Sequence, residues 1–140
     1  MTTAIRAILL VLMTCALACL LPGQSYEGYI DQVSCGQIGG WAYDGNATDR
    51  VDVTILTYNS YRPATVLTTV VANLYRADLP GAGIGDGYHA FSIPIPPDLV
   101  NGQGYYITAV FGNYNPNTIP TYLTNSGLYV LQCSPGTQTS

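Results

Sequence analysis

The chain contains no lysine, and its four arginines and one histidine face eight acidic residues. Charged residues make up only 9% of the 140 residues, and the net charge is −4. Nucleic-acid binding requires clustered lysine and arginine that neutralise phosphates, and attraction to an anionic membrane surface requires the same groups. The composition therefore argues against both kinds of partner.

Residues that favour helices are scarce as well. There is one glutamate, and beyond residue 25 no helical hydrophobic period extends for more than about one turn. The twelve tyrosines, with many threonines, asparagines and glycines, are typical of β-strands and polar loops. We therefore expect an all-β protein.

The first 25 residues have the pattern of a secretory signal peptide. Arg6 precedes an uncharged apolar run, residues 7–21, and small and turn-forming residues follow it. The run is shorter than the roughly 20 apolar residues of a comfortable membrane span. We therefore expect a protein that is secreted or held at the cell surface, without membrane insertion after the leader is removed. The expected organisation is a cleaved signal peptide over 1–25, one domain over 26–133 and a flexible tail over 134–140.

The site of cleavage has alternatives. Small residues precede both Cys19 and Tyr26, and we favour the cut before Tyr26 because it also removes Leu20 and Leu21. In a third interpretation, Cys19 becomes a lipidated N-terminal cysteine that anchors the protein.

Two cysteines, Cys35 and Cys133, remain after the leader. In an oxidising compartment such a pair usually forms a disulfide, here joining the first and last strands. Two distant cysteines and one histidine do not make a zinc site.

Seven segments rich in β-branched and aromatic residues are separated by turn-forming residues. In one of them, Val51, Val53 and Ile55 alternate with polar residues, which predicts one buried and one exposed face. This spacing predicts a single immunoglobulin-like β-sandwich of about seven strands. The expected strands cover residues 28–34, 37–43, 50–58, 64–74, 88–95, 104–112 and 127–133.

Tyrosines in loops and at strand ends are the candidate ligand-binding residues. A tyrosine ring can stack on a sugar or anchor a protein interface. The segment 113–124, which contains two prolines, is long for a loop and is a candidate contact surface. The predicted ligand-binding residues are Tyr58, Tyr61, Tyr114 and Tyr122.

His89 is the only histidine in the sequence, so acid–base catalysis would depend on it or on a pair of carboxylates. It alternates with Phe91 and Ile93, which predicts a buried structural histidine. A small hydrolase that uses His89 with Asp86 or Asp78 is the least favoured alternative.

Four loop aspartates raise the possibility of bound calcium. Their spacing matches no EF-hand loop, and turns capped by aspartate side chains explain them more simply. The glycine-rich residues 81–87 precede a strand rather than a helix, so they do not form a dinucleotide motif. We therefore expect no metal and no cofactor. The four aspartates are Asp44, Asp49, Asp78 and Asp86.

Several short motifs occur in a fixed order along the chain. The motifs are GYID at 28–31, Cys35, GWAYD at 40–44, RADL at 76–79, GYHAF at 87–91 and LQC at 131–133. Together they resemble a family of bacterial extracellular β-sandwich modules with no established activity, although Ala90 stands where that family usually has glycine. The resemblance implies scaffold roles rather than catalytic ones. The scaffold positions are Trp41, Asp44, Arg76, Asp78, His89 and Phe91.

These observations favour a secreted, non-catalytic binding module that recognises an extracellular glycan or surface protein through its tyrosines. The alternative is a structural subunit of an extracellular or cell-surface assembly that self-associates through its sheet edges and tyrosines.

Overall fold

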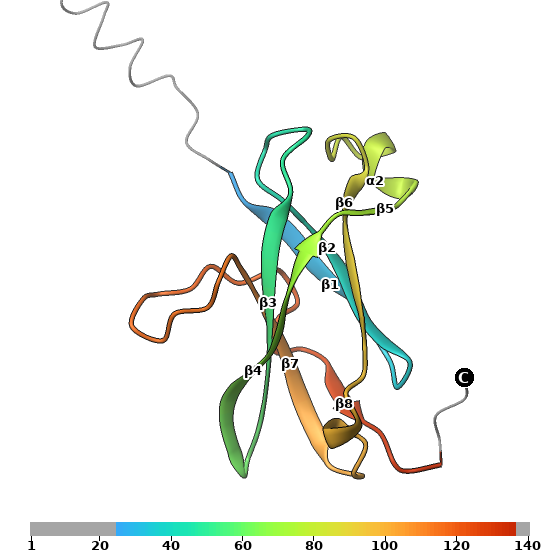
Figure 1. Ribbon diagram of the computed structural model, residues 1–140, viewed down its shortest axis with the longest axis vertical. Helices are drawn as coiled ribbons and strands as arrows, with labels where there is room; N and C mark the ends of the chain where they lie inside the picture. Colours follow the sequence, from blue (N-terminus) through green and yellow to red (C-terminus); the bar gives the residue numbers. More distant parts are fainter. Residues whose placement is uncertain (1–24, 137–140) are drawn as a thin grey trace, which may run out of the picture.

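The protein is an all-β sandwich of two antiparallel four-stranded sheets, as seen in a computed structural model that describes residues 25–136 (Figure 1). The first sheet has the order β1–β2–β6–β5 and the second has the order β4–β3–β7–β8. Residues 1–24 of the predicted leader, with Cys19, and residues 137–140 lie outside the described residues. The strands are β1 Glu27–Val33, β2 Gln37–Tyr43, β3 Val51–Asn59, β4 Arg62–Ala72, β5 Leu74–Tyr75, β6 Tyr88–Pro94, β7 Gly104–Phe111 and β8 Val130–Gln132.

The strand orders correspond to an immunoglobulin-like arrangement. The first sheet matches the four-stranded sheet of that fold, and β8, β7 and β3 match its three-stranded sheet, which β4 extends by one strand. The prediction of an immunoglobulin-like sandwich is therefore confirmed.

Two strand predictions need correction. The predicted strand at 64–74 is two strands in different sheets, because the chain crosses between the sheets after Ala72, which is fully buried at the corner. The last strand is shorter than the predicted 127–133, because Gly127 adopts a positive φ of 78° before β8 begins.

The core lies between the two sheets and follows the two-residue period of the strands. Val51, Val53 and Ile55 face inward as predicted. Thr54, expected on the exposed face, is instead 1% exposed. Its hydroxyl donates to the Gly112 carbonyl at 2.7 Å, so the chain that follows β7 covers this part of the sheet.

The long segment after β7 closes one side of the sandwich. The amide of Leu123 donates to Ala109 of β7 at 2.8 Å, and the amide of Thr124 donates to Gly28 of β1 at 2.8 Å. Thr124 also accepts from the amide of Ile30 at 3.0 Å. Residues 121–124 therefore connect the two sheets, and the buried Leu123 side chain joins the core.

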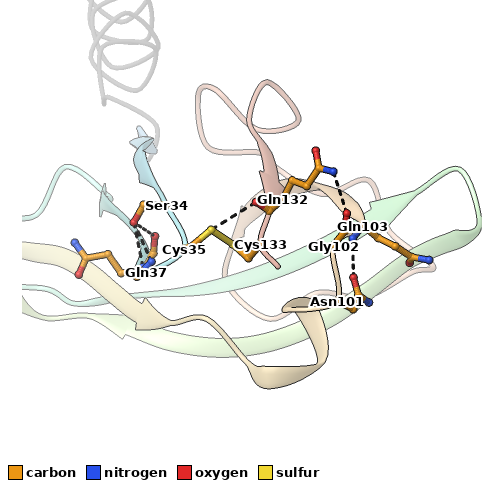
Figure 2. Close-up of a disulfide and its surroundings, with 9 residues drawn as sticks. Ser34, Cys35, Gln37, Asn101, Gly102, Gln103, Gln132 and Cys133 are labelled. Carbon is orange, nitrogen blue, oxygen red and sulfur yellow. Dashed lines mark hydrogen bonds between the residues drawn. A yellow bond between two sulfur atoms is a disulfide. The ribbon is translucent and has the colours of Figure 1, made fainter. Parts of the chain in front are cut away.

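The disulfide between Cys35 and Cys133 forms a second connection between the sheets. Cys35 lies in the turn between β1 and β2, and Cys133 directly follows β8 (Figure 2). Their Cα atoms are 5.7 Å apart. The predicted disulfide between the first and last strands is therefore confirmed.

Helical structure is limited to one turn at Asp78–Gly81 (α2) and a 3₁₀ turn at Pro97–Leu99 (η1) among the described residues. No helix within residues 25–136 has the length and apolar character needed to span a membrane. The chain leaves the first sheet at a run of prolines, because β6 ends at Pro94 and η1 begins at Pro97.

We expect the double variant Cys35→Ala/Cys133→Ala to lose about 2–5 kcal/mol of unfolding free energy, because the bond limits the unfolded chain over a separation of 98 residues. Guanidinium denaturation of the variant and the wild type measures the difference. Reduction of the disulfide in the wild type should lower the denaturation midpoint similarly without any amino-acid substitution. Equal midpoints for the oxidised and reduced protein would contradict the prediction.

Candidate binding groove

A groove of about 630 Å³ lies on the outer face of the second sheet. Its walls come from β3, β4 and β7 and from the segment that closes the sandwich. It brings together Tyr58 and Tyr122, two of the four predicted ligand-binding tyrosines. The lining residues are Tyr58, Ala64, Thr108, Tyr122, Leu123, Asn125, Ser126, Gly127 and Leu128.

Tyr58 is held in place by the neighbouring strand. It lies opposite Tyr106 of β7 in the strand register, and the two rings stack with their centroids 5.1 Å apart at an angle of 20°. On the groove side, a Cβ atom at Gly127 would approach the Tyr58 hydroxyl to 3.2 Å. Glycine at this position therefore lets the loop pass close to the tyrosine without displacing it.

Tyr122 is positioned by the backbone around it. It forms an antiparallel bridge with Val110, while the next residue, Leu123, is buried in the core. The Tyr122 side chain remains 55% exposed. Because the backbone on both sides of it is hydrogen-bonded to the sandwich, this tyrosine lies on a fixed segment rather than on a free loop.

The groove has little free polar chemistry. No aspartate, glutamate, arginine or lysine lines it. Ser126 both accepts from and donates to the backbone of Ala109 at 3.0 Å, and the Asn125 amide donates to Ile30 at 3.2 Å. Among the described residues, neither tyrosine hydroxyl has a hydrogen-bond partner, so these hydroxyls are the groups available to a ligand.

The other two predicted tyrosines lie elsewhere. Tyr61 is 87% exposed in the turn between β3 and β4 and lines a separate groove of about 360 Å³ with Tyr106 and Val130. Tyr114 is half-buried, and its amide donates to the Thr54 hydroxyl at 3.3 Å. Neither lines the larger groove.

Exposed apolar side chains beside the groove were not among the predicted binding residues. Leu128 is 74% exposed, Val130 is 53% exposed and Tyr106 is 41% exposed. Alternation along β7 signals the outward position of Tyr106, because Tyr105 and Ile107 face the core. The position of Leu128 has no such signal, because it precedes β8 in an irregular segment.

Trp41 packs on the outer face of the first sheet, in a cluster with Leu79, Ile84 and Ala90. The Tyr29 ring stacks on it with centroids 5.3 Å apart. Trp41 thus belongs to a second, smaller core beneath α2, whereas Phe91 lies in the main core.

Arg76 forms ion pairs with two aspartates. Its guanidinium lies 2.7 Å from Asp31 and 2.8 Å from Asp78. The hydrogen bond from Arg76 lowers the pKa of Asp78, and the same bond is the main cause of the raised pKa of Arg76. Arg76 thus pairs with a residue two positions later in the chain, and Asp31 completes a link between β1 and the segment before α2.

His89 is fully buried, as its alternation with Phe91 predicts. Its Nε2 lies 3.1 Å from the Ala47 carbonyl and 3.3 Å from Asp86, and Asp86 is bound by both terminal nitrogens of Arg50 at 2.8 and 3.1 Å. The Arg50 bond is the first cause of the lowered pKa of Asp86. A histidine without solvent access and a carboxylate already paired are poorly arranged for a hydrolase.

The loop aspartates considered as calcium ligands do not gather. Within the described part of the chain, no three His, Cys, Asp or Glu side chains form a group that could hold a metal ion. Asp44 accepts a hydrogen bond from the amide of Asn46 at 2.9 Å, which is the predicted turn-capping role.

The lowered pKa of Asp86 predicts a pH dependence of stability. Its ion pair with Arg50 stabilises the folded state above the ordinary carboxyl pKa of about 4, and this contribution is lost as the pH falls through the lowered folded-state value. We expect Asp86→Asn to be less stable at neutral pH and to depend less steeply on pH in the acid range. Denaturation midpoints between about pH 2 and 7 measure this.

The matched control is Asp98→Asn, because Asp98 is exposed and belongs to none of the ion pairs in the described structure. Its profile should follow the wild type. Parallel profiles for the wild type and Asp86→Asn would show that the Arg50 pair contributes nothing.

Comparisons with models of protein families, with curated proteins and with solved structures found no match to this chain. The resemblance to bacterial extracellular β-sandwich modules thus stays a prediction that depends on its motifs.

Proposed function

We propose that this protein is a secreted, non-catalytic binding module that recognises an extracellular glycan or surface protein through the groove between Tyr58 and Tyr122. The observation that carries the proposal is the convergence of two fixed tyrosines on one uncharged groove. Tyr58 comes from a strand and Tyr122 from the closing segment, 64 positions later in the chain.

The chemistry of the groove suits a neutral ligand. Aromatic faces can stack on the apolar face of a sugar ring or on an apolar side chain, and the two free tyrosine hydroxyls can hydrogen-bond to the same ligand. Because no charged side chain lines the groove, a strongly anionic or cationic ligand gains no ion pair there. The groove therefore favours neutral glycans and uncharged protein surfaces.

Fixed positions of the two tyrosines favour binding in a second way. Tyr58 is stacked on Tyr106, and the segment that carries Tyr122 is hydrogen-bonded to both sheets. A stacked ring at Tyr58 and a fixed backbone at Tyr122 leave less conformational entropy to be lost when a ligand binds. This arrangement supports recognition by a largely preformed site.

Two observations support a non-catalytic role. The single histidine is fully buried, and the nearby Asp86 is held by Arg50. General acid–base catalysis requires a group within hydrogen-bond reach of the substrate. The exposed tyrosines of the groove provide contacts for binding, and no histidine, aspartate or glutamate lines it.

The disulfide and the predicted leader are compatible with a location outside the cell, where glycans and surface proteins are available. The secreted or cell-surface location is part of this proposal.

We expect Tyr122→Ala to lose most of the retention that the wild-type protein shows on arrays of glycans and of extracellular proteins. The variant removes one aromatic wall of the groove. Tyr75→Ala is the matched control, because Tyr75 is also 55% exposed but lies on the first sheet. Its retention should equal that of the wild type.

Unchanged retention in Tyr122→Ala, or equal losses in the two variants, would place the ligand outside this groove. Wild-type protein that is retained on neither array would contradict the proposed binding function itself.

A further inference from the structure

The two sheets have four edge strands, and three of them are protected against pairing with another chain. Natural β-proteins keep edge strands short or cover them, because an open edge presents unpaired backbone groups. Edge strand β5 has two residues and β8 has three. The edge of β1 is covered where Thr124 pairs with Gly28 and Ile30.

The fourth edge strand, β4, is long and open. It has 11 residues and pairs only with β3 among the described strands. After Arg62 it contains no charged residue, and its sequence is dominated by threonine and valine. Val66 is 46% exposed and Val71 is 44% exposed. Protection by a charged side chain within the strand is therefore missing after Arg62, and the remaining protective features are Pro63 and the bulge between Val66 and Thr68.

We propose that β4 pairs antiparallel with β4 of a second copy of this chain, so that the second sheet continues across a two-fold axis. A strand edge fits another extended strand, because its free N–H and C=O groups match only a backbone with the same spacing. The occupant is a second copy because the edge is complementary to itself in both side-chain orientation and charge. The pairing does not require a bound ligand.

The side-chain orientations follow from a bulge in β4. The register against β3 shifts between Val66 and Thr68, so Ala64 and Val66 before the shift and Thr69 after it share the outer face. A two-fold axis between residues 66 and 67 places Ala64 opposite Thr69 of the second copy. Away from the axis, outer residues then meet outer residues, as a continuous sheet requires. At the axis, Val66 faces outward and Leu67 packs against the core, so the bulges of the two copies lie side by side there. Pro63 has no amide hydrogen, so the backbone pairing begins at Ala64.

The charges at the two ends of the edge are complementary. Arg62 begins β4, and Asp52 of β3 lies beside Val71 near the other end. Neither side chain forms an ion pair among the described residues. In the proposed register, Arg62 lies beside Val71 of the second copy, two strand spacings or about 10 Å from Asp52. The long arginine side chain can reach across this separation, and the symmetry provides the contact twice.

Sedimentation velocity tests the proposal on the protein recovered after expression of the full chain. We expect a reversible dimer in the wild type and at least about a tenfold weaker dimer in Val66→Lys. The substitution puts one new positive charge from each copy beside the two-fold axis, where the two charges repel each other. Val130→Lys is the matched control. Val130 is 53% exposed on the outer face of β8 in the same sheet, so this variant should dimerise like the wild type.

A charge exchange tests the register. We expect Arg62→Asp and Asp52→Arg each to weaken the dimer, and the double variant to recover most of the lost affinity. Circular dichroism and thermal unfolding of each variant separate a loss of pairing from a loss of fold. A wild-type protein that remains monomeric up to about 1 mM would overturn the proposal. A dimer that Val66→Lys and Val130→Lys weaken equally, or that the double variant does not restore, would overturn it as well.

Discussion

The backbone pairing of residues 121–124 with both sheets is the constraint on which the rest of the structure depends. Leu123 bonds to β7 and Thr124 bonds to β1, so one short segment closes the side of the sandwich between them. The closure buries Leu123 and leaves the preceding Tyr122 outside. Gly28 is needed at this place, because a Cβ atom there would lie 2.7 Å from the Trp41 carbonyl and 3.1 Å from Leu123. The same backbone hydrogen bonds therefore close the core, cover the edge of β1 and position Tyr122 in the candidate groove.

The few charges of the domain are concentrated around the loops of the first sheet. Arg50 binds Asp86 in the loop before β6, and Arg76 joins Asp31 of β1 to Asp78 of α2. Exposed ion pairs usually contribute little to global stability. The Arg50–Asp86 and Arg76–Asp31 pairs nevertheless connect segments that are distant in the chain, whereas the Arg76–Asp78 pair is local. The outer face of the second sheet has no such network, which leaves its tyrosines and valines open to contact. The low charge of the sequence therefore has different consequences on the two sheets.

Much of the fold follows from local signals in the sequence. The two-residue period predicts the inward faces of the strands and the burial of His89. The change of sheet after Ala72 has little local signal, because only Asn73 separates β4 from Leu74 and Tyr75 of β5. The closure by Thr124 is also invisible in the sequence, since its partner Ile30 is 94 positions away and the bonds involve only backbone atoms.

The difference between local signals and nonlocal contacts also explains which tyrosines line the candidate groove. Exposed tyrosines at strand ends can be recognised one by one, but their convergence depends on contacts between distant segments. Tyr58 and Tyr122 meet because the closing segment returns along β7, whereas Tyr61 projects from a turn and Tyr114 lies beside Thr54. Composition therefore indicates the kind of contact, and the nonlocal pairing decides which tyrosines share a site.

The binding groove and the open edge lie on the same sheet, and Ala64 belongs to both. A two-fold axis perpendicular to that sheet directs both grooves of the proposed dimer to one side. A shallow groove with two free hydroxyls offers few strong contacts to a single ligand unit, and linking two such sites can increase overall affinity by about 10²–10⁴ when one ligand spans both. Ligands with repeated units, such as glycan chains or densely displayed surface proteins, gain most from this geometry. In the proposed dimer, the open edge of β4 thereby has a role that a covered edge would not permit.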